Sequence, residues 1–245
     1  MKYKIKLENV TVQYRIPSER IGTLKEYIIK MVQGKVKHNI LRALNGINLE
    51  IFEGEVFGVI GHNGAGKSTL LKLIARVLPP SQGRIEIFGN VSPLLELGAG
   101  FHPELSGREN VFLNGALLGY SRKEMREKFD SIVDFSGLKG FIDSPIRTYS
   151  SGMWARLGFA VATANRPDIL LVDEILAVGD EEFQLKCFNR IEEFKNSGTT
   201  IILVAHSMRM ILEQCTRVCW LDHGGINFIG DPSEAIENYR KSQKM

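Results

Sequence analysis

Alternating apolar and polar residues predict two strands near the start of the chain. Apolar side chains recur at almost every second position over residues 1–15, and residues 41–60 return to a strand pattern. The positions are Ile5, Leu7, Val10, Val12, Ile47, Leu49 and Ile51. A period of two places them on one face, so we expect each strand to bury one side. Gly54 then turns the chain into an apolar strand at 56–60.

The second half of the chain carries two short apolar runs, one at 169–174 that ends in two carboxylates and one at 199–205. Such runs are typical of parallel strands in a sheet that is covered on both faces. We expect a crossover helix at 181–195 between them and a closing helix at 232–241. A hairpin is predicted around His223-Gly224-Gly225. The further expected strands are 84–88, 218–222 and 226–229.

Helical periodicity dominates from about residue 109 to residue 164. Ser121-x-x-Glu124 is a capping box. The residues along one face after it are Met125, Phe129, Ile132 and Val133. We therefore expect a helical subdomain at about 105–165, inserted between strands of the core. Residues 91–110 just before it predict a loop with unusual glycine use.

Residues 16–40 differ from the strands on either side. Thr23 is a candidate cap for a short helix with one apolar stripe formed by Leu24, Tyr27, Ile28 and Met31. The remaining positions and the flanks are rich in lysine and arginine. Such a basic amphipathic insertion lies on a membrane surface or docks on a partner. The alternative is a helix that packs on its own sheet and exposes its charged face to solvent.

Composition limits the function classes. With 245 residues, 44% hydrophobic and 24% charged, the chain is typical of a soluble globular protein. The net charge of +3 is too small to indicate nucleic-acid binding, although it permits contact with an anionic membrane surface. Cys187, Cys215 and Cys219 lack a second Cys/His pair, which argues against a metal site and fits a reducing cytosol. We see no signal-peptide core and no apolar run near about 18 residues, so we expect any membrane role to require a partner.

One segment predicts a nucleoside triphosphate site. It is Gly61-His62-Asn63-Gly64-Ala65-Gly66-Lys67-Ser68-Thr69, and it fits the pattern G-x-x-x-x-G-K-[ST]. Its glycines let successive backbone N–H groups face a phosphate, and the following helix adds a favourable dipole. Lys67 is placed to reach the β- and γ-phosphates, and Ser68 to put its hydroxyl on Mg²⁺. A strand before the segment and a helix after it supply the required context.

Three further residues are expected at the same edge of the sheet. Asp173 ends an apolar strand, where a doubly wound sheet binds its ligand, and is expected to hold Mg²⁺ through water. Glu174 follows it and is the candidate base for the attacking water. His206 ends the neighbouring strand and is expected to bond the γ-phosphate.

A second phosphate-binding element is predicted at Tyr149-Ser150-Ser151-Gly152-Met153. Two hydroxyls and a glycine at the start of a helix form an anion site. One nucleotide bound in the usual way needs only the phosphate loop. The second phosphate-binding element therefore has no role in a single ordinary nucleotide site.

These motifs, in this order, resemble an ABC-type ATPase over nearly all of residues 1–245. The resemblance implies an α/β fold: a P-loop NTPase core with an antiparallel β subdomain and an inserted α-helical subdomain. It implies ATP hydrolysis with ATP and Mg²⁺ as cofactors, and two chains that bind two ATP head to tail. It also makes Ser150, Ser151 and Gly152 the signature, His206 the switch histidine and Leu176 to Asp180 the D-loop.

Two further positions follow from the resemblance, and the first of them, Tyr14, also ends a strand and precedes a loop. The family places an aromatic ring on adenine, and Tyr14 stands at that position. Glu96 stands where the family has its Q-loop glutamine and is expected near Mg²⁺. The signature also departs from Leu-Ser-Gly-Gly-Gln, since Tyr149, Ser151 and Met153 replace the leucine, the first glycine and the glutamine.

The stretches 95–104, 149–153 and 173–180 are similar to the ATP-binding subunits of exporters of O-antigen, teichoic acid or capsule. This implies a homodimer on integral-membrane permease subunits, peripheral to the cytoplasmic face of the inner membrane. The assembled transporter would handle a lipid-linked polysaccharide, and no nucleic acid would be bound. The alternative is a soluble ABC ATPase that acts on nucleic acid or ribosomes. Against it, no heptads separate the phosphate loop from the signature, and the chain has one such domain.

Overall fold

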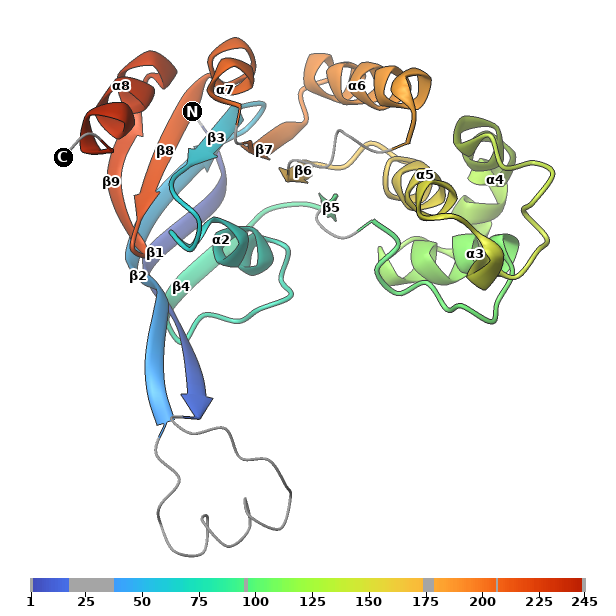
Figure 1. Ribbon diagram of the computed structural model, residues 1–245, viewed down its shortest axis with the longest axis horizontal. Coiled ribbons are helices and arrows are strands. Elements are labelled where there is room, and N and C mark those ends of the chain that lie inside the picture. The colour runs from blue at the N-terminus through green and yellow to red at the C-terminus, as the bar shows by residue number, and fades with distance from the viewer. Residues whose placement is uncertain (1, 18–37, 95–96, 174–178, 206, 244–245) are drawn as a thin grey trace, which may run out of the picture.

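The computed structural model describes residues 2–17, 38–94, 97–173, 179–205 and 207–243 (Figure 1). Its strands are β1 Tyr3–Pro17, β2 His38–Phe52, β3 Val56–Ile60, β4 Gln82–Ile87, β5 Val91–Pro93, β6 Ile169–Asp173, β7 Thr200–Val204, β8 Arg217–Asp222 and β9 Gly225–Gly230. Its helices are α2 Lys67–Ile74, α3 Gly107–Leu117, α4 Arg122–Ser136, the 3₁₀ turn η1 Ile146–Thr148, α5 Ser151–Ala162, α6 Glu181–Asn196, α7 Met208–Gln214 and α8 Pro232–Ser242.

The strands form two sheets. A three-stranded antiparallel sheet has the order β2-β1-β4, and a six-stranded sheet has the order β5-β6-β7-β3-β8-β9. Within the larger sheet only the β8–β9 pair is antiparallel among the described strands. The expected α/β fold, with one antiparallel and one mainly parallel sheet, is therefore confirmed.

The alternating pattern of the first two strands buries one face of the antiparallel sheet. Ile5, Leu7 and Ile51 are at most 2% exposed and pack with α2 and with Phe57 of β3. The parallel sheet packs against α2 and the antiparallel sheet on one face. It packs against α6, α7 and α8 on its other face. Both faces are thus covered, as the wholly apolar strands predict.

Helices α3, α4 and α5 form a lobe beside the sheets in Figure 1. The capping box at Ser121 is confirmed, since its side chain accepts from the Glu124 N–H and the Glu124 carboxylate accepts from the Ser121 N–H. Met125 and Ile132 lie in the buried core of the lobe. Phe135, Phe159 and Phe183 then form a ring cluster that connects α4 and α5 to α6.

Residues 91–110 are not wholly a loop, so that prediction is wrong in part. Val91–Pro93 form β5, and α3 begins at Gly107. Three residues are too few to show a period of two, and β5 exists because β6 pairs with it in parallel. Helix α7 was also not predicted, because its seven residues span only two turns.

The predicted helix at Thr23 to Gln33 lies outside the described residues. Strands β1 and β2, which precede and follow it in the chain, extend from the body as a two-stranded ribbon (Figure 1). Among the described residues, every helix is too short or too polar to span a lipid bilayer.

Candidate functional site

The phosphate loop connects β3 to α2 at the edge where the parallel strands end. Its last glycine, Gly66, caps α2 in a left-handed conformation. No side chain of the described residues caps this helix, and its first turn contains no acidic residue. The first N–H groups and the helix dipole therefore remain available for an anion.

Two of the loop glycines are required by close backbone contacts. A Cβ on Gly61, whose φ is +151°, would lie 2.2 Å from the Leu221 carbonyl oxygen. A Cβ on Gly66, whose φ is +111°, would lie 2.6 Å from the Ala43 carbonyl oxygen. The Gly224 N–H also donates to the Ala65 carbonyl over 3.0 Å. The loop is therefore seated between β2 and the β8–β9 turn.

Lys67 curls back over the loop. Its Nζ donates to the Gly61 carbonyl at 2.7 Å and to the His62 carbonyl at 3.0 Å. Burial lowers the pKa of Lys67, and the nearby charge of Asp173 acts in the opposite direction. The cation and the carboxylate at the end of β6 therefore belong to one site. A phosphate bound here would contact the Lys67 ammonium, which is partly shielded from water, and this strengthens their attraction.

The parallel strands place Asp173 and the phosphate loop at the same edge of the sheet. Asp173 of β6 lies opposite Val204 of β7, and β7 lies beside β3, which leads into the loop. Glu96, Glu174 and His206 lie outside the described residues, so their roles stay predictions. The segment Leu176 to Asp180 is described only at its last two residues.

The second predicted anion site opens α5. Ser150 is its N-cap, and its Oγ accepts a 3.2 Å bond from the Met153 N–H. Ser150, Ser151 and Gly152 line an open groove together with Arg156 and Asp180. Arg156 bonds Asp180 at 2.6 Å and lies over the Phe183 ring. Arg156 is not among the residues that the motif predicts, although it follows Gly152 by four residues and so faces the same side of the helix.

The two phosphate-binding elements of one chain lie in different parts of the molecule. Helix α2 belongs to the sheet body, whereas α5 belongs to the helical lobe (Figure 1). One bound phosphate group is therefore not shared by both elements within a single chain.

Tyr14 lies on β1 opposite Leu41 of β2, two pairs beyond Val12 opposite Leu44. Its ring is half-buried and packs on the core cluster. Ala43 and Leu44 approach Gly66 and Gly224, so Tyr14 lies close along the ribbon to the phosphate loop.

The three cysteines are buried and free. Burial raises the pKa of each thiol to about 12, so all three stay protonated near neutral pH. None of them is suited to bind a metal or act as a nucleophile there.

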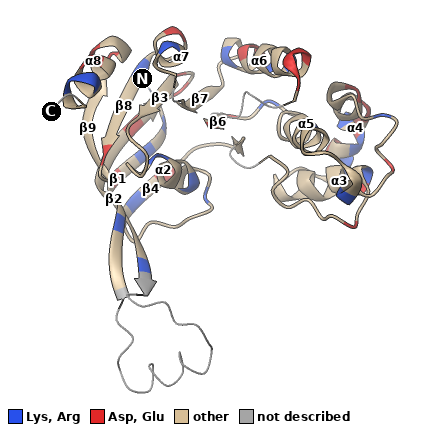
Figure 2. Cartoon of the chain, viewed as in Figure 1, with Lys and Arg blue, Asp and Glu red and all other residues tan. Residues whose placement is uncertain are grey.

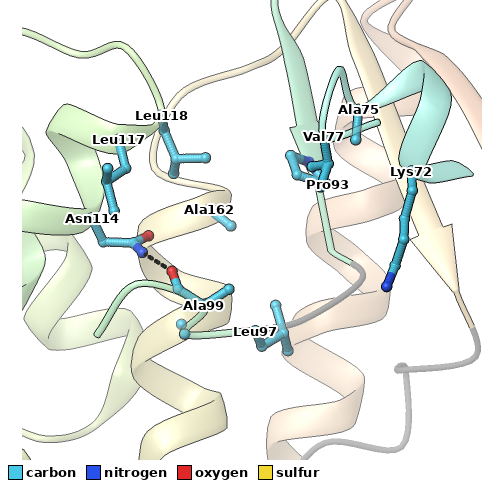
Figure 3. A pocket seen from close by; sticks show the side chains of 12 residues that line it. Lys72, Ala75, Val77, Pro93, Leu97, Ala99, Asn114, Leu117, Leu118 and Ala162 are labelled. Carbon is cyan, nitrogen blue, oxygen red and sulfur yellow. Dashed lines mark hydrogen bonds between the residues drawn. The ribbon is translucent and has the colours of Figure 1, made fainter. Parts of the chain in front are cut away.

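A cleft separates the sheet body from the helical lobe (Figure 3). Most of its lining is apolar, and Lys72 is its one charged residue among the described ones. Val77 on one wall is 69% exposed, and Leu117 on the other is 65% exposed. Asn114 holds the lining segment around Ala99 in place, because its side-chain amide donates to the Ala99 carbonyl at 2.7 Å (Figure 3).

Comparison with known proteins gives consistent matches. Residues 44–177 match the family described as ABC transporter. The chain is 48% identical over 223 residues to the O-antigen export system ATP-binding protein RfbB of Myxococcus xanthus, covering 90% of this chain and 51% of that protein. It is 43% identical to the RfbB protein of Klebsiella pneumoniae, with 99% of each covered. It is 38% identical to the teichoic acids export ATP-binding protein TagH of Bacillus anthracis, covering 98% of this chain and 43% of that protein.

The chain thus spans about half the length of the Myxococcus relative, and almost all of the Klebsiella relative. Among solved structures, a dimeric ATP-binding cassette in a post-hydrolysis state with ADP and Pi superposes with a TM-score of 0.71. The sequence identity is 23%, and the match covers 93% of this chain and 98% of that one. This likeness supports the fold.

Proposed function

The chain belongs to the ABC transporter family, and from this premise we propose that it powers export of a cell-surface polysaccharide by binding and hydrolysing ATP. The phosphate loop is the observation that carries the nucleotide part, because Lys67 and the uncapped start of α2 converge on one anion site. The relatives named for O-antigen and teichoic acid export support the polysaccharide part.

The residues around the loop fit a nucleotide with Mg²⁺. Hydroxyl and carboxylate oxygens are the ligands that Mg²⁺ prefers, and Ser68 and Asp173 supply one of each, with Glu96 as a further candidate. The bound ion would neutralise charge on the phosphates. Backbone N–H groups from Asn63 to Thr69 and the Lys67 ammonium would hold the phosphates. Glu174 would orient the attacking water, and His206 would bond the γ-phosphate.

Two chains would complete each nucleotide site. Because α5 lies away from the phosphate loop of its own chain, its N-terminus is free to face a nucleotide held by a second copy. A two-fold axis would then create two equivalent sites, each with Lys67 from one chain and Ser150 to Gly152 from the other.

The permease would dock on the cleft between the sheet body and the helical lobe. An apolar cleft with exposed Val77 and Leu117 on its two walls suits an apolar helical segment of a membrane subunit. The chain would then sit on the cytoplasmic face of the membrane as a peripheral subunit. Arg15 and Arg42 on the β1–β2 ribbon are exposed. Figure 2 shows positively charged positions on both strands of this ribbon. Together with the basic segment beyond them, they would contact anionic lipid or the permease.

The test separates hydrolysis from export. Lys67→Ala and Glu174→Gln chains are purified for ATPase measurement and also supplied to cells that lack the chromosomal copy. Lys67→Ala should lose ATP binding, whereas Glu174→Gln should bind ATP and lose about 10²–10⁴-fold in turnover. Surface polysaccharide should disappear with both. Normal surface polysaccharide in cells that carry an inactive ATPase would refute the export role, and copurification with nucleic acid would favour the soluble alternative.

A further inference from the structure

Three side chains without a role in the proposed ATP hydrolysis lie close together where the phosphate loop contacts the β8–β9 turn. They are His62 from the loop itself, Asp222 at the end of β8, and His223 in the β8–β9 turn. Their ligand atoms all lie within 4.8 Å of one another. His62 Nε2 is 3.0 Å from Asp222 Oδ1, and His223 Nε2 is 3.9 Å from the same oxygen.

The His62 ring is already oriented for a ligand on Nε2. Its Nδ1 lies 2.7 Å from the Asn63 carbonyl oxygen, which can only accept, so Nδ1 carries the proton. In the neutral ring this leaves Nε2 with a free lone pair 3.0 Å from Asp222 Oδ1, without the alignment of a hydrogen bond. Nε2 is inaccessible to water and has no hydrogen-bond partner in the described part of the chain. Two electron-rich atoms at 3.0 Å repel each other unless a cation or a proton lies between them.

We propose that His62, Asp222 and His223 form a binding site for a divalent metal ion of the zinc class. Two imidazoles and one carboxylate make a common three-residue zinc set, with the fourth position left for water. Bonds of about 2.0–2.2 Å in a tetrahedral site place neighbouring ligand atoms about 3.4 Å apart. Two of the three separations, 3.0 and 3.9 Å, bracket this value, and the third lies within 4.8 Å.

The backbone bond to the non-ligating nitrogen of His62 is also typical of metal sites. A ligating histidine almost always donates its other ring N–H to a carbonyl or carboxylate, which fixes the tautomer. Imidazole donors select zinc-class ions over Mg²⁺, which prefers oxygen. The site is therefore chemically distinct from the proposed magnesium site at Ser68 and Asp173.

Metal binding here would tie the phosphate loop to the β8–β9 turn. The two segments already touch, because the Gly224 N–H donates to the Ala65 carbonyl. A bound ion would add a second, stronger link through the residue that follows Gly61. The metal would thus hold the loop in one shape.

The test is a Co²⁺ titration of the untagged full chain, with excess Mg²⁺ present and the visible absorption of tetrahedral Co²⁺ as the signal. Zn²⁺ should displace the Co²⁺ and remove the signal. His223→Ala is the main variant, because this side chain is 84% exposed and its loss should not disturb folding. Asp222→Asn is the second variant. His102→Ala is the matched control, since His102 is an exposed histidine in another loop.

We expect His223→Ala and Asp222→Asn to weaken Co²⁺ binding by at least the 10–100-fold that loss of an outer partner costs at such sites. His102→Ala should bind as the wild type does. The proposal is overturned if the wild-type chain gives no tetrahedral signal. It is equally overturned if His223→Ala binds Co²⁺ with unchanged affinity.

Discussion

The Asp168 carboxylate joins distant parts of the chain. Its Oδ2 accepts the Asn90 N–H at 2.9 Å, and its Oδ1 accepts from Lys4 Nζ at 3.2 Å. The Asn90 N–H is the main cause that lowers the pKa of Asp168 below its ordinary value of 3.8, with Lys4 contributing. A folded pKa below the unfolded one gives stability that is present above about pH 4 and is lost as the pH falls through the folded value.

We therefore expect Asp168→Asn to be less stable than the wild type by about 1 kcal/mol at pH 7. The difference should shrink below pH 4, where the wild-type carboxylate also becomes neutral. Urea unfolding of both proteins from pH 7 to pH 3 measures it. Glu53→Gln is the control, because Glu53 pairs with the same Lys4 ammonium from the turn after β2. A difference that stays constant over this pH range would show that charge is not the cause.

Tyr14 is expected to stack on adenine, because its half-buried ring lies on β1 close to the phosphate loop. Tyr14→Ala should weaken ATP binding by about 1–2 kcal/mol, since base–ring stacking contributes that much. Tyr14→Phe keeps the ring and should bind almost normally. Nucleotide titrations of the two variants decide the matter. Equal affinity in Tyr14→Ala and wild type would assign Tyr14 to core packing alone.

At the scale of single elements, the N-terminus of α5 offers a matched experiment. Ser150 and Ser121 are both N-cap serines that accept an N–H three residues on. Replacing either by arginine should cost about 1 kcal/mol of stability through the lost cap. Only Ser150→Arg should abolish hydrolysis, because only α5 is proposed to face the nucleotide of the second chain. Nucleotide binding by the single chain should survive in both.

ATPase rates and nucleotide affinities of the two variants, measured side by side, check this prediction. Full turnover by Ser150→Arg would rule out the head-to-tail site. Equal loss of turnover in both variants would point instead to a general effect of destabilising the helical lobe.

The elements also show what the sequence can predict and why. Helix α4 was predicted because its capping box and apolar stripe are local signals. The phosphate loop was predicted because phosphate binding requires particular residue types at a fixed spacing. Strand β5 was not, because its three residues depend on pairing with β6, about 80 positions later in the chain. The His62, Asp222 and His223 cluster was missed for the same reason, since only the fold brings the loop and the turn together.

At the scale of the whole molecule, the cleft between the sheet body and the helical lobe is lined by segments that lie far apart in the sequence. No local sequence pattern connects these segments. Val77 follows α2, whereas Leu117 ends α3, and they face one cleft from opposite sides (Figure 3). Both are largely exposed, although the cleft is mostly apolar. An apolar segment of a permease would bury them, and this gives the proposed transporter a route from the nucleotide site to the membrane.

Val77→Asp and Leu117→Asp should therefore weaken binding to the permease at least tenfold, about 1.4 kcal/mol, because each would bury an unpaired carboxylate in an apolar contact. The ATPase activity of the isolated chain should change little, since neither residue belongs to the nucleotide site. Leu185→Asp on α6 is the control: Leu185 is 60% exposed and does not line the cleft. Copurification with the permease and the amount of surface polysaccharide are measured for all three. If Leu185→Asp reduces them as much as the cleft variants do, or if the cleft variants reduce neither, the permease docks elsewhere on the molecule.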